Sequence, residues 1–345
     1  MDIATLAERV TQFALAHHDP RDCWIKATAI SGVLAWDDPD AVRAVENWMR
    51  GAIATQRTNG NLNYADAVQA IAAGHVRSFT PTAALPAALG FPLMQFYARN
   101  RNPAFLEAAR RQYQALRDSP RTSDGGVWAR AEGPELWIDF VHLMAPFMAL
   151  YGKMAGDANA VDEAFRQYRI HVGHLVDPAK KLARHAWCER PDHFPQSTFW
   201  SRGNGWLVCA SVELLDIAPD HADARFVAKT CGEALEAIAR CQDASGFLCH
   251  VLDDPRSNLE ASGTLMFAYA AARAVALGAA SAELLAPAAG AFVAVARTVD
   301  AAGKVPGVAV PPGGPGVPFD WTQFGQGFFL LAAKALEGQV KAIPA

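Results

Sequence analysis

Apolar residues recur at helical spacing along most of the chain. In residues 3–17 they fall at Ile3, Leu6, Val10, Phe13 and Leu15, close to the period of about 3.6 residues that an amphipathic helix shows. Alternation with a period of two is nearly absent, and residues 247–252 form the one plausible strand. The helical pattern predicts further helices over 23–36, 39–56, 64–74, 83–99, 103–117, 135–151, 158–176, 204–217, 222–242, 259–278, 281–299 and 320–337.

The predicted helices come in pairs, joined by loops that alternate between short and long. Consecutive pairs can close into a ring with one helix of each pair inside, so we expect an all-α toroid of about six helix pairs. A stacked solenoid is the alternative, but the chain has no repeating signature of that kind. The length of 345 residues permits two domains, but a toroid of this size forms one unit, and we expect a single domain over residues 1–345.

The segment 135–151 is apolar at almost every position after its first residue, so a helix there has no face for water. Asp139 lies within this predicted buried helix, where a carboxylate is rare unless it is paired or used. Pro146 frees the carbonyl of His142 and bends the helix close to Asp139, which favours a cavity. The alternative is a structural Asp139 that caps or hydrogen-bonds a neighbouring loop, and we expect His142 to be a structural neighbour.

Composition and charge argue against several kinds of partner. Apolar residues make up 51% of the chain and charged residues 19%, and the net charge of −4 is spread without a basic run. Nucleic acid and anionic membranes are therefore not expected as partners. No uncharged apolar stretch reaches the ~18 residues of a membrane span, and the N-terminal residues lack a signal-peptide pattern. The six cysteines show no CxxC and no zinc spacing, so we expect free thiols and a cytoplasmic location.

A second group of polar and aromatic residues lies in a segment predicted to be irregular. His185 precedes Trp200, Arg202, Asn204 and Trp206, and the intervening glycines allow a ligand to approach the backbone. A guanidinium matches a carboxylate with two parallel hydrogen bonds, and indole rings offer flat faces to a sugar. Each residue alone also has a structural explanation. The tryptophans could belong to the core, Arg202 could form an ion pair in a loop, and His185 could be a hydrogen-bonded polar group. Together they favour a pocket for an acidic sugar.

Seven motifs follow one another along the chain: Pro-Arg-Thr-Ser-Asp-Gly-Gly-Val-Trp (120–128), Glu-Leu-Trp-Ile-Asp (135–139), Met-Ala-Pro-Phe-Met-Ala (144–149), Trp-Ser-Arg-Gly-Asn-Gly-Trp (200–206), Leu-Asp-Asp-Pro (252–255), Leu-Glu-Ala-Ser-Gly-Thr (259–264) and Phe-Gly-Gln-Gly-Phe-Phe-Leu-Leu (324–331). In this order they resemble the unsaturated glucuronyl and rhamnogalacturonyl hydrolases, glycoside hydrolase families 88 and 105, with family 105 the nearer. The similarity runs from residue 100, approximately, to residue 337. It implies an (α/α)6 barrel, in agreement with the predicted helix pairs.

The resemblance also implies a reaction, the removal of a 4,5-unsaturated uronic acid from the non-reducing end of oligosaccharides left by polysaccharide lyases. The C4=C5 double bond of this sugar is attached to the ring oxygen as a vinyl ether. An acid protonates C4, water adds at C5, and the resulting hemiketal opens and releases the aglycone. Asp139 matches the catalytic acid of the family, and burial beside Trp137 would keep its proton in place. The expected substrate contacts are Trp137, His185, Trp200, Arg202, Asn204 and Trp206.

One part of the family pattern is missing. The family usually places a second Asp just before an inner helix, but no acid occurs here between Asp66 and Glu107. Thr80 or Thr82 is a candidate hydrogen-bonding substitute. A catalytically silent sugar-binding relative is therefore an alternative to the hydrolase. A sugar epimerase with paired histidines is a third reading, although the histidines here do not fall on matching inner helices.

No cofactor and no metal are expected. Ligand spacings such as HExxH are absent, and the stretch 303–318, rich in Gly and Pro, lacks the lysine of a phosphate-binding loop. That stretch is either a lid over the mouth of the barrel or a connector. A small oligosaccharide is the expected partner, and we expect a monomer or a homodimer.

Overall fold

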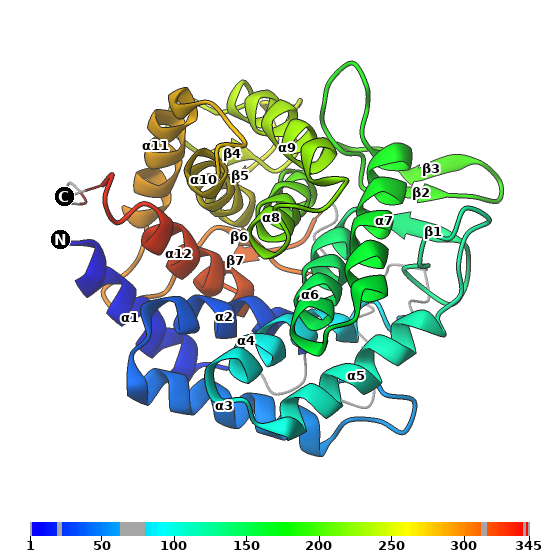
Figure 1. The fold of residues 1–345 in the computed structure, drawn as a ribbon. Helices are drawn as coiled ribbons and strands as arrows, with labels where there is room; N and C mark the ends of the chain where they lie inside the picture. Colours follow the sequence, from blue (N-terminus) through cyan, green and yellow to red (C-terminus); the bar gives the residue numbers. More distant parts are fainter. Residues whose placement is uncertain (1, 19–22, 63–79, 312–315, 341–342, 344–345) are drawn as a thin grey trace.

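The computed structural model describes residues 2–18, 23–62, 80–311, 316–340 and 343. Over these residues the chain forms twelve α-helices in two concentric rings, which is an (α/α)6 barrel (Figure 1). The predicted all-α toroid of helix pairs is therefore confirmed. The helix predicted over 64–74 lies outside the described residues.

Six helices form the inner ring, in which each contacts its neighbours and the last returns to the first: α2 (Cys23–Trp36), α4 (Gly90–Asn100), α6 (Asp139–Ala155), α8 (Ser201–Ile217), α10 (Ala261–Ala276) and α12 (Gln323–Ala335). The outer ring consists of α1 (Ile3–Ala16), α3 (Pro39–Ala54), α5 (Pro103–Arg117), α7 (Ala158–Leu175), α9 (Ala224–Ala239) and α11 (Leu285–Ala296). The inner helix α8 is enclosed almost completely, with only Asp216 exposed. Outer helices bury one stripe, as α5 does with Phe105, Tyr113 and Leu116.

The loops of the barrel are unequal in a regular way. Connections that leave an inner helix are short, whereas connections that enter one are long, except the connection before α2. Since successive helices alternate between the rings, all inner helices begin at the same end, and the long loops gather there as a mouth. These loops also contain one 3₁₀-helix and seven short strands: η1 (Pro86–Leu89), β1 (Glu135–Trp137), β2 (Ala186–Cys188), β3 (His193–Gln196), β4 (Leu248–Cys249), β5 (Leu259–Glu260), β6 (Val308–Ala309) and β7 (Phe319–Asp320). A second 3₁₀-helix, η2 (Ala282–Leu284), precedes the outer helix α11.

The strands form three small antiparallel sheets at the mouth, with the pairings β1–β2–β3, β4–β5 and β6–β7. Only β4 falls in the one segment predicted to be a strand. The other strands are two to four residues long, which is too short to show an alternating pattern in the sequence.

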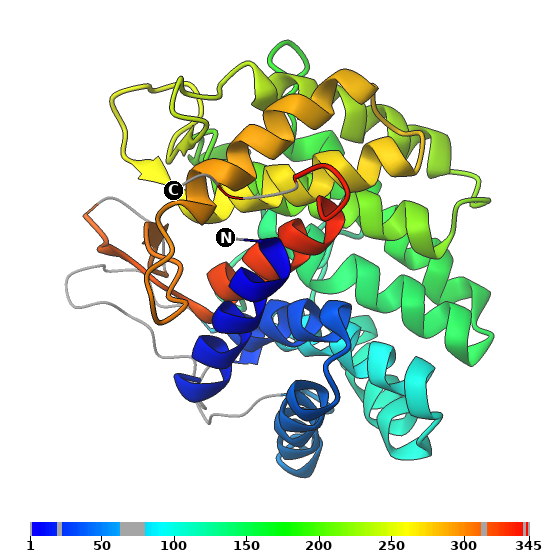
Figure 2. The same cartoon turned by 90° about the vertical axis from the view of Figure 1, so that its left-hand side faces the viewer.

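The first and last inner helices close the ring. The indole N–H of Trp36 donates to the Leu330 carbonyl at 3.0 Å. A Cβ on Gly32 would lie only 2.7 Å from the carbonyl oxygen of Gly327, so glycine allows the backbones of α2 and α12 to touch. Figure 2 shows α1 alongside α12, where the amide of Gln326 donates to a carbonyl of α1.

Helix starts follow the expected capping chemistry. The Asp38 carboxylate accepts from the Ala41 N–H at 2.8 Å, and Pro39 occupies the first turn of α3. At the start of α5 the Asn102 side chain accepts from the Ala104 N–H at 3.0 Å, and Pro103 occupies the first turn. Side-chain caps thus mark the starts of α3 and α5.

Three predicted helix starts are wrong. The helix predicted to begin at residue 83 begins at Gly90, after η1. Residues 135–137 form β1 rather than the first turn of a helix, so α6 begins at Asp139 and then runs through Pro146. Residues 201–203, which precede the helix predicted over 204–217, form the first turn of α8. The last two changes matter for the site, because they place Asp139 and Arg202 at the starts of inner helices.

Cysteines and membrane segments follow the sequence expectations where the structure describes them. Cys188, Cys209, Cys231, Cys241 and Cys249 are free thiols, as predicted. No helix within the described ranges has the length and apolar character needed to cross a bilayer.

Candidate active site

A carboxylate and an imidazole meet where α6 begins. Asp139 is the first residue of α6, its side chain is 19% exposed, and its Oδ2 lies 3.1 Å from Nε2 of His185. This oxygen is buried and has no hydrogen-bond partner among the described residues, so the His185 contact is an ion-pair distance without hydrogen-bond geometry. The His185 ring lies between two indoles, with centroids 5.5 Å from Trp137 and 4.9 Å from Trp200. The structure therefore brings the predicted acid together with three of the predicted contacts.

Strand pairing brings Asp139 and His185 together. Trp137 lies opposite Ala186 in the β1–β2 ladder, and the Ile138 N–H donates to the His185 carbonyl at 3.0 Å. Asp139 follows directly, in the first turn of α6, where the helix N-terminus favours a negative charge.

A buried ion pair between Arg130 and Glu135 fixes the indole N–H of Trp137. Its indole N–H donates to Glu135 Oε2 at 2.9 Å, and the same carboxylate receives two hydrogen bonds from Arg130, at 3.0 and 2.6 Å. Glu135 is only 2% exposed, which makes this bidentate pair a rigid support. The indole N–H of Trp137 is thereby used inside the protein, and the ring face remains for a ligand.

Arg202 lies behind Trp200 rather than at the surface of the mouth. It is 1% exposed, its guanidinium lies 4.3 Å from the Trp200 ring centroid, and its Nη1 donates to the Ala309 carbonyl at 2.8 Å. Burial lowers the pKa of the Arg202 guanidinium, and the charges of Glu260 and Asp139 act against this. Arginine stays charged at neutral pH even so. Arg202 therefore supports the wall formed by Trp200.

Asn204 and Trp206 are also internal. The Asn204 side chain accepts from the Ala183 N–H at 2.7 Å and donates to the carbonyls of Ala183 and Trp200 at 3.0 Å each. Its amide thus pins the loop that precedes His185 to the start of α8. Trp206 is 1% exposed and lies against His142, with the ring centroids 4.9 Å apart.

Glu260 is a buried carboxylate that the sequence reasoning missed. It caps α10 by accepting from the N–H groups of Ser262 and Gly263, and it also accepts from the Ala309 N–H at 3.1 Å. Its Oε1 lies 3.7 Å from Nη1 of Arg202. The signal available in the sequence was an acid directly before a helical pattern, which is typical of a helix N-terminus.

Thr82 is not free to replace the missing acid in this structure. It is buried, and its hydroxyl donates to the Trp128 carbonyl at 2.6 Å. The described part of the chain also contains no cluster of three or more His, Cys, Asp or Glu side chains that would suit a metal ion.

Structural comparison defines the class of fold. A possible member of glycoside hydrolase family 105 from Salmonella enterica serovar Paratyphi A superposes with a TM-score of 0.84 at 22% identity, covering 97% of this chain and 93% of that one. A family 105 glycoside hydrolase from C. acetobutylicum gives 0.82 at 21% identity, covering 96% and 99%. The protein is therefore an (α/α)6 barrel of the type found in these glycoside hydrolases.

The chain belongs to Glycosyl Hydrolase Family 88, because residues 8–337 match the model of that family. Sequence relatives include the unsaturated rhamnogalacturonyl hydrolase YesR of Bacillus subtilis, 26% identical over 53% of this chain and 55% of the relative. The unsaturated 3S-rhamnoglycuronyl hydrolase of Formosa agariphila is 28% identical over 57% and 56%, respectively. The matches span little more than half the length of these relatives. The resemblance inferred from the motifs is confirmed.

Proposed function

We propose that this protein removes a 4,5-unsaturated uronic acid from the non-reducing end of lyase-generated oligosaccharides, with Asp139 as the general acid and base. The observation that carries the proposal is the 3.1 Å contact between Asp139 Oδ2 and His185 Nε2, on a partly exposed carboxyl at the mouth of the barrel. Membership of the glycoside hydrolase family and the named relatives support the same reaction class.

Asp139 acts first as a proton donor to C4 of the double bond. Positive charge then develops at C5, where the ring oxygen shares it, and water adds to C5 after losing a proton to the Asp139 carboxylate. The C5 hemiketal opens by breaking its bond to the ring oxygen, which leaves a ketone at C5 and a hemiacetal at C1. That hemiacetal collapses to an aldehyde and expels the aglycone as an alcohol.

The other residues of the mouth divide into contacts and supports. Trp137 and Trp200 flank His185 and offer ring faces on which the sugar lies. His185 orients the Asp139 carboxyl or the attacking water. We assign Arg202, Asn204 and Trp206 to positions behind this surface, because each is at most 1% exposed. In this grouping the substrate contacts lie on β1, on the loop before β2 and directly before α8, next to Asp139 at the start of α6.

A turnover experiment tests the proposal. The protein is incubated with unsaturated disaccharides produced by lyases from pectin, ulvan and glycosaminoglycans, and both the conjugated-alkene absorbance and the released aglycone are followed. Hydration predicts that absorbance falls in step with aglycone release. Aglycone release with the alkene intact at early times would indicate direct displacement at C1, and no change with any of these substrates would refute the proposal.

A further inference from the structure

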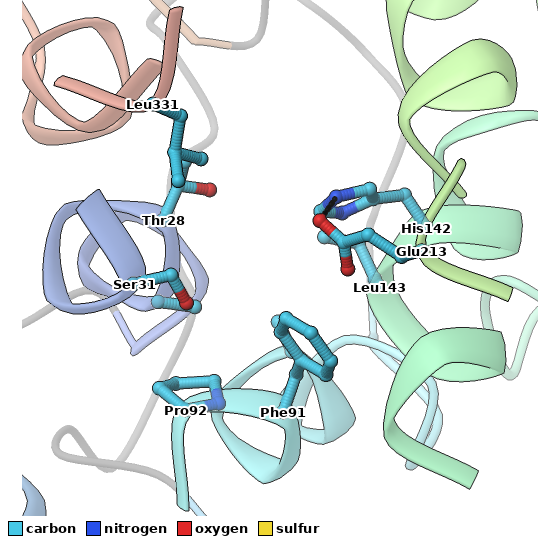
Figure 3. Close-up of a pocket in the computed structure, with 10 residues that line it drawn as sticks. Thr28, Ser31, Phe91, Pro92, His142, Leu143, Glu213 and Leu331 are labelled. Atoms are coloured by element: carbon cyan, nitrogen blue, oxygen red, sulfur yellow. Dashed lines mark ion pairs between the residues drawn. The ribbon is translucent and has the colours of Figure 1, made fainter. Parts of the chain in front are cut away.

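A second polar site lies on the barrel axis, one helical turn deeper than Asp139. The inner helices surround a small pocket of about 20 Å³ (Figure 3). This is enough space for about one water molecule or one hydroxyl group, and too little for a whole sugar ring. Its walls come from α2, η1, α4, α6, α8 and α12: Ala27, Thr28, Ser31, Ala88, Phe91, Pro92, His142, Leu143, Glu213 and Leu331.

One wall of this deep pocket carries a carboxylate. Glu213 lies in the middle of α8, its side chain is only 8% exposed, and its Oε2 is buried without a hydrogen-bond partner in the described structure. Such a group is costly unless something donates to it. Its Oε1 lies 3.5 Å from Nε2 of His142, too far for a good hydrogen bond, and that nitrogen is also buried without a partner.

The two unsatisfied groups point into the same space. Figure 3 shows His142 and Glu213 side by side, facing Thr28 and Ser31 across the pocket, with Phe91 and Pro92 below them. A hydroxyl group between the pair can donate to the carboxylate and accept from the imidazole at once. A purely apolar ligand would leave both groups unpaired.

His142 connects this pocket to the mouth. It follows Asp139 by three residues on α6, so the two side chains are neighbours on one face of the helix. The His142 ring also packs against Trp206, which in turn makes an edge contact with Trp24 at 6.4 Å. No acid occurs in the chain between Asp66 and Glu107, so the 86–92 wall of the pocket is apolar, and Glu213 supplies its carboxylate from the opposite side.

We propose that Glu213 and His142 form a hydroxyl-binding floor for the sugar at Asp139, and that this pair selects for the free ring hydroxyls of the unsaturated uronic acid. The proposal rests on the proposed function, since it assumes that the sugar binds at Asp139. Glu213 accepts a hydrogen bond from one ring hydroxyl through Oε2, and His142 exchanges a hydrogen bond with the same hydroxyl or its neighbour.

The test measures binding apart from turnover. In an Asp139→Asn background, the affinity for a pectin-derived unsaturated disaccharide is measured by calorimetry with and without Glu213→Gln. We expect Glu213→Gln to weaken binding by about 10- to 100-fold, the usual size of a hydrogen bond to a charged group. The control is Glu236→Gln, on the exposed face of α9, which should leave binding unchanged. His142→Gln provides a second variant with the same expected direction.

Kinetics in the Asp139-containing protein give the second readout. Loss of a hydroxyl contact that is present in both ground and transition states raises KM and leaves kcat nearly unchanged. If the protein turns over the disaccharide and neither Glu213→Gln nor His142→Gln changes KM or affinity, this inference is overturned while the proposed function stands. If the protein neither binds nor converts any of the disaccharides from pectin, ulvan and glycosaminoglycans, the proposed function fails as well.

Discussion

Arg202 and Glu260 bind the two backbone groups of one residue, Ala309. Arg202 donates to the carbonyl of Ala309 at 2.8 Å, and Glu260 accepts from the N–H of Ala309 at 3.1 Å. The two charged side chains are 1% and 0% exposed, and Nη1 and Oε1 lie 3.7 Å apart. Through this pair the starts of α8 and α10 are both bonded to β6. The three long loops that contain these segments are therefore held in fixed positions relative to one another.

Breaking this pair should destabilise the fold strongly. Arg202→Met leaves the Glu260 carboxylate buried without its counter-charge, which costs about 3–5 kcal/mol in the free energy of unfolding. The measurement is urea unfolding at neutral pH. Arg256→Met is the matched control, because the Arg256–Asp254 pair is 89% and 39% exposed and should contribute less than about 1 kcal/mol. A small loss for Arg202→Met, with a large loss of sugar affinity, would instead make Arg202 a direct substrate contact.

Asp139→Asn should remove activity and keep the fold. The change is nearly isosteric, but the amide cannot donate the proton to C4, so we expect kcat to fall by at least about 10²–10⁴-fold. Circular dichroism and the thermal midpoint should match those of the unsubstituted protein. Asp216→Asn, the exposed acid on α8, is the control and should leave kcat unchanged. Residual turnover within a few fold would assign the proton transfer to another residue.

His171 should make the protein sensitive to acid. Its ring is 0% exposed, Nδ1 donates to the Gln167 carbonyl, and burial lowers the pKa of His171 to about 4. As the pH falls below the ordinary pKa of about 6.5, the unfolded chain takes up a proton that the folded protein resists until about pH 4. The free energy of unfolding should therefore drop by about 3 kcal/mol as the pH falls across this interval. Above the ordinary pKa, His171 should make no pH-dependent contribution to the free energy of unfolding.

The check is urea unfolding at several pH values between neutral and pH 4. His171→Leu should lose about 3 kcal/mol less than the unsubstituted protein over this interval. His193→Gln, an exposed histidine in β3, should retain the full acid sensitivity. If the free energy of unfolding falls equally steeply with pH in His171→Leu and in the unsubstituted protein, His171 is not the source of the acid sensitivity.

Gly303 should tolerate no side chain. Its φ is +92°, and a Cβ there would collide with the backbone of Arg9 in α1. Gly303→Ala should therefore cost more than about 2 kcal/mol, from backbone strain and the displacement of α1 together. Gly278→Ala is the control, because φ is +71° but nothing lies within 4 Å, so only about 1 kcal/mol of strain is expected. Thermal midpoints of the two variants give the comparison, and equal shifts would contradict it.

The described helices could be predicted from the sequence, but the starts of α4, α6 and α8 could not. Leu136 and Ile138 fit the apolar pattern of a helix as well as that of a short buried strand. Residues 135–137 form a strand because they pair with β2, which lies far along the chain, and no local sequence pattern reveals this pairing. In α8 the glycines suggested a loop, but Gly205 serves helix packing, since a Cβ there would lie 2.7 Å from Cβ of Met266 on α10.

The candidate site was predictable only where a residue stood out from its neighbours in the sequence, and not where its role depends on distant contacts. Asp139 stood out as an acid in an apolar segment, whereas the closeness of His185 depends on the fold and came from the family resemblance. The exposure of Arg202 could not be judged from its neighbours in sequence. Glu213 left a signal that was not used, because it follows Trp206 by seven residues and so lies on the same helix face.

The closure between α2 and α12 determines when the barrel can be completed during synthesis. Residues 323–335 leave the ribosome after the other eleven described helices, yet they cover the backbone at Gly32 and accept the hydrogen bond from Trp36. Until then α2 exposes an apolar flank, the kind of surface that chaperones recognise in unfinished proteins. The nascent chain should therefore remain aggregation-prone until α12 emerges.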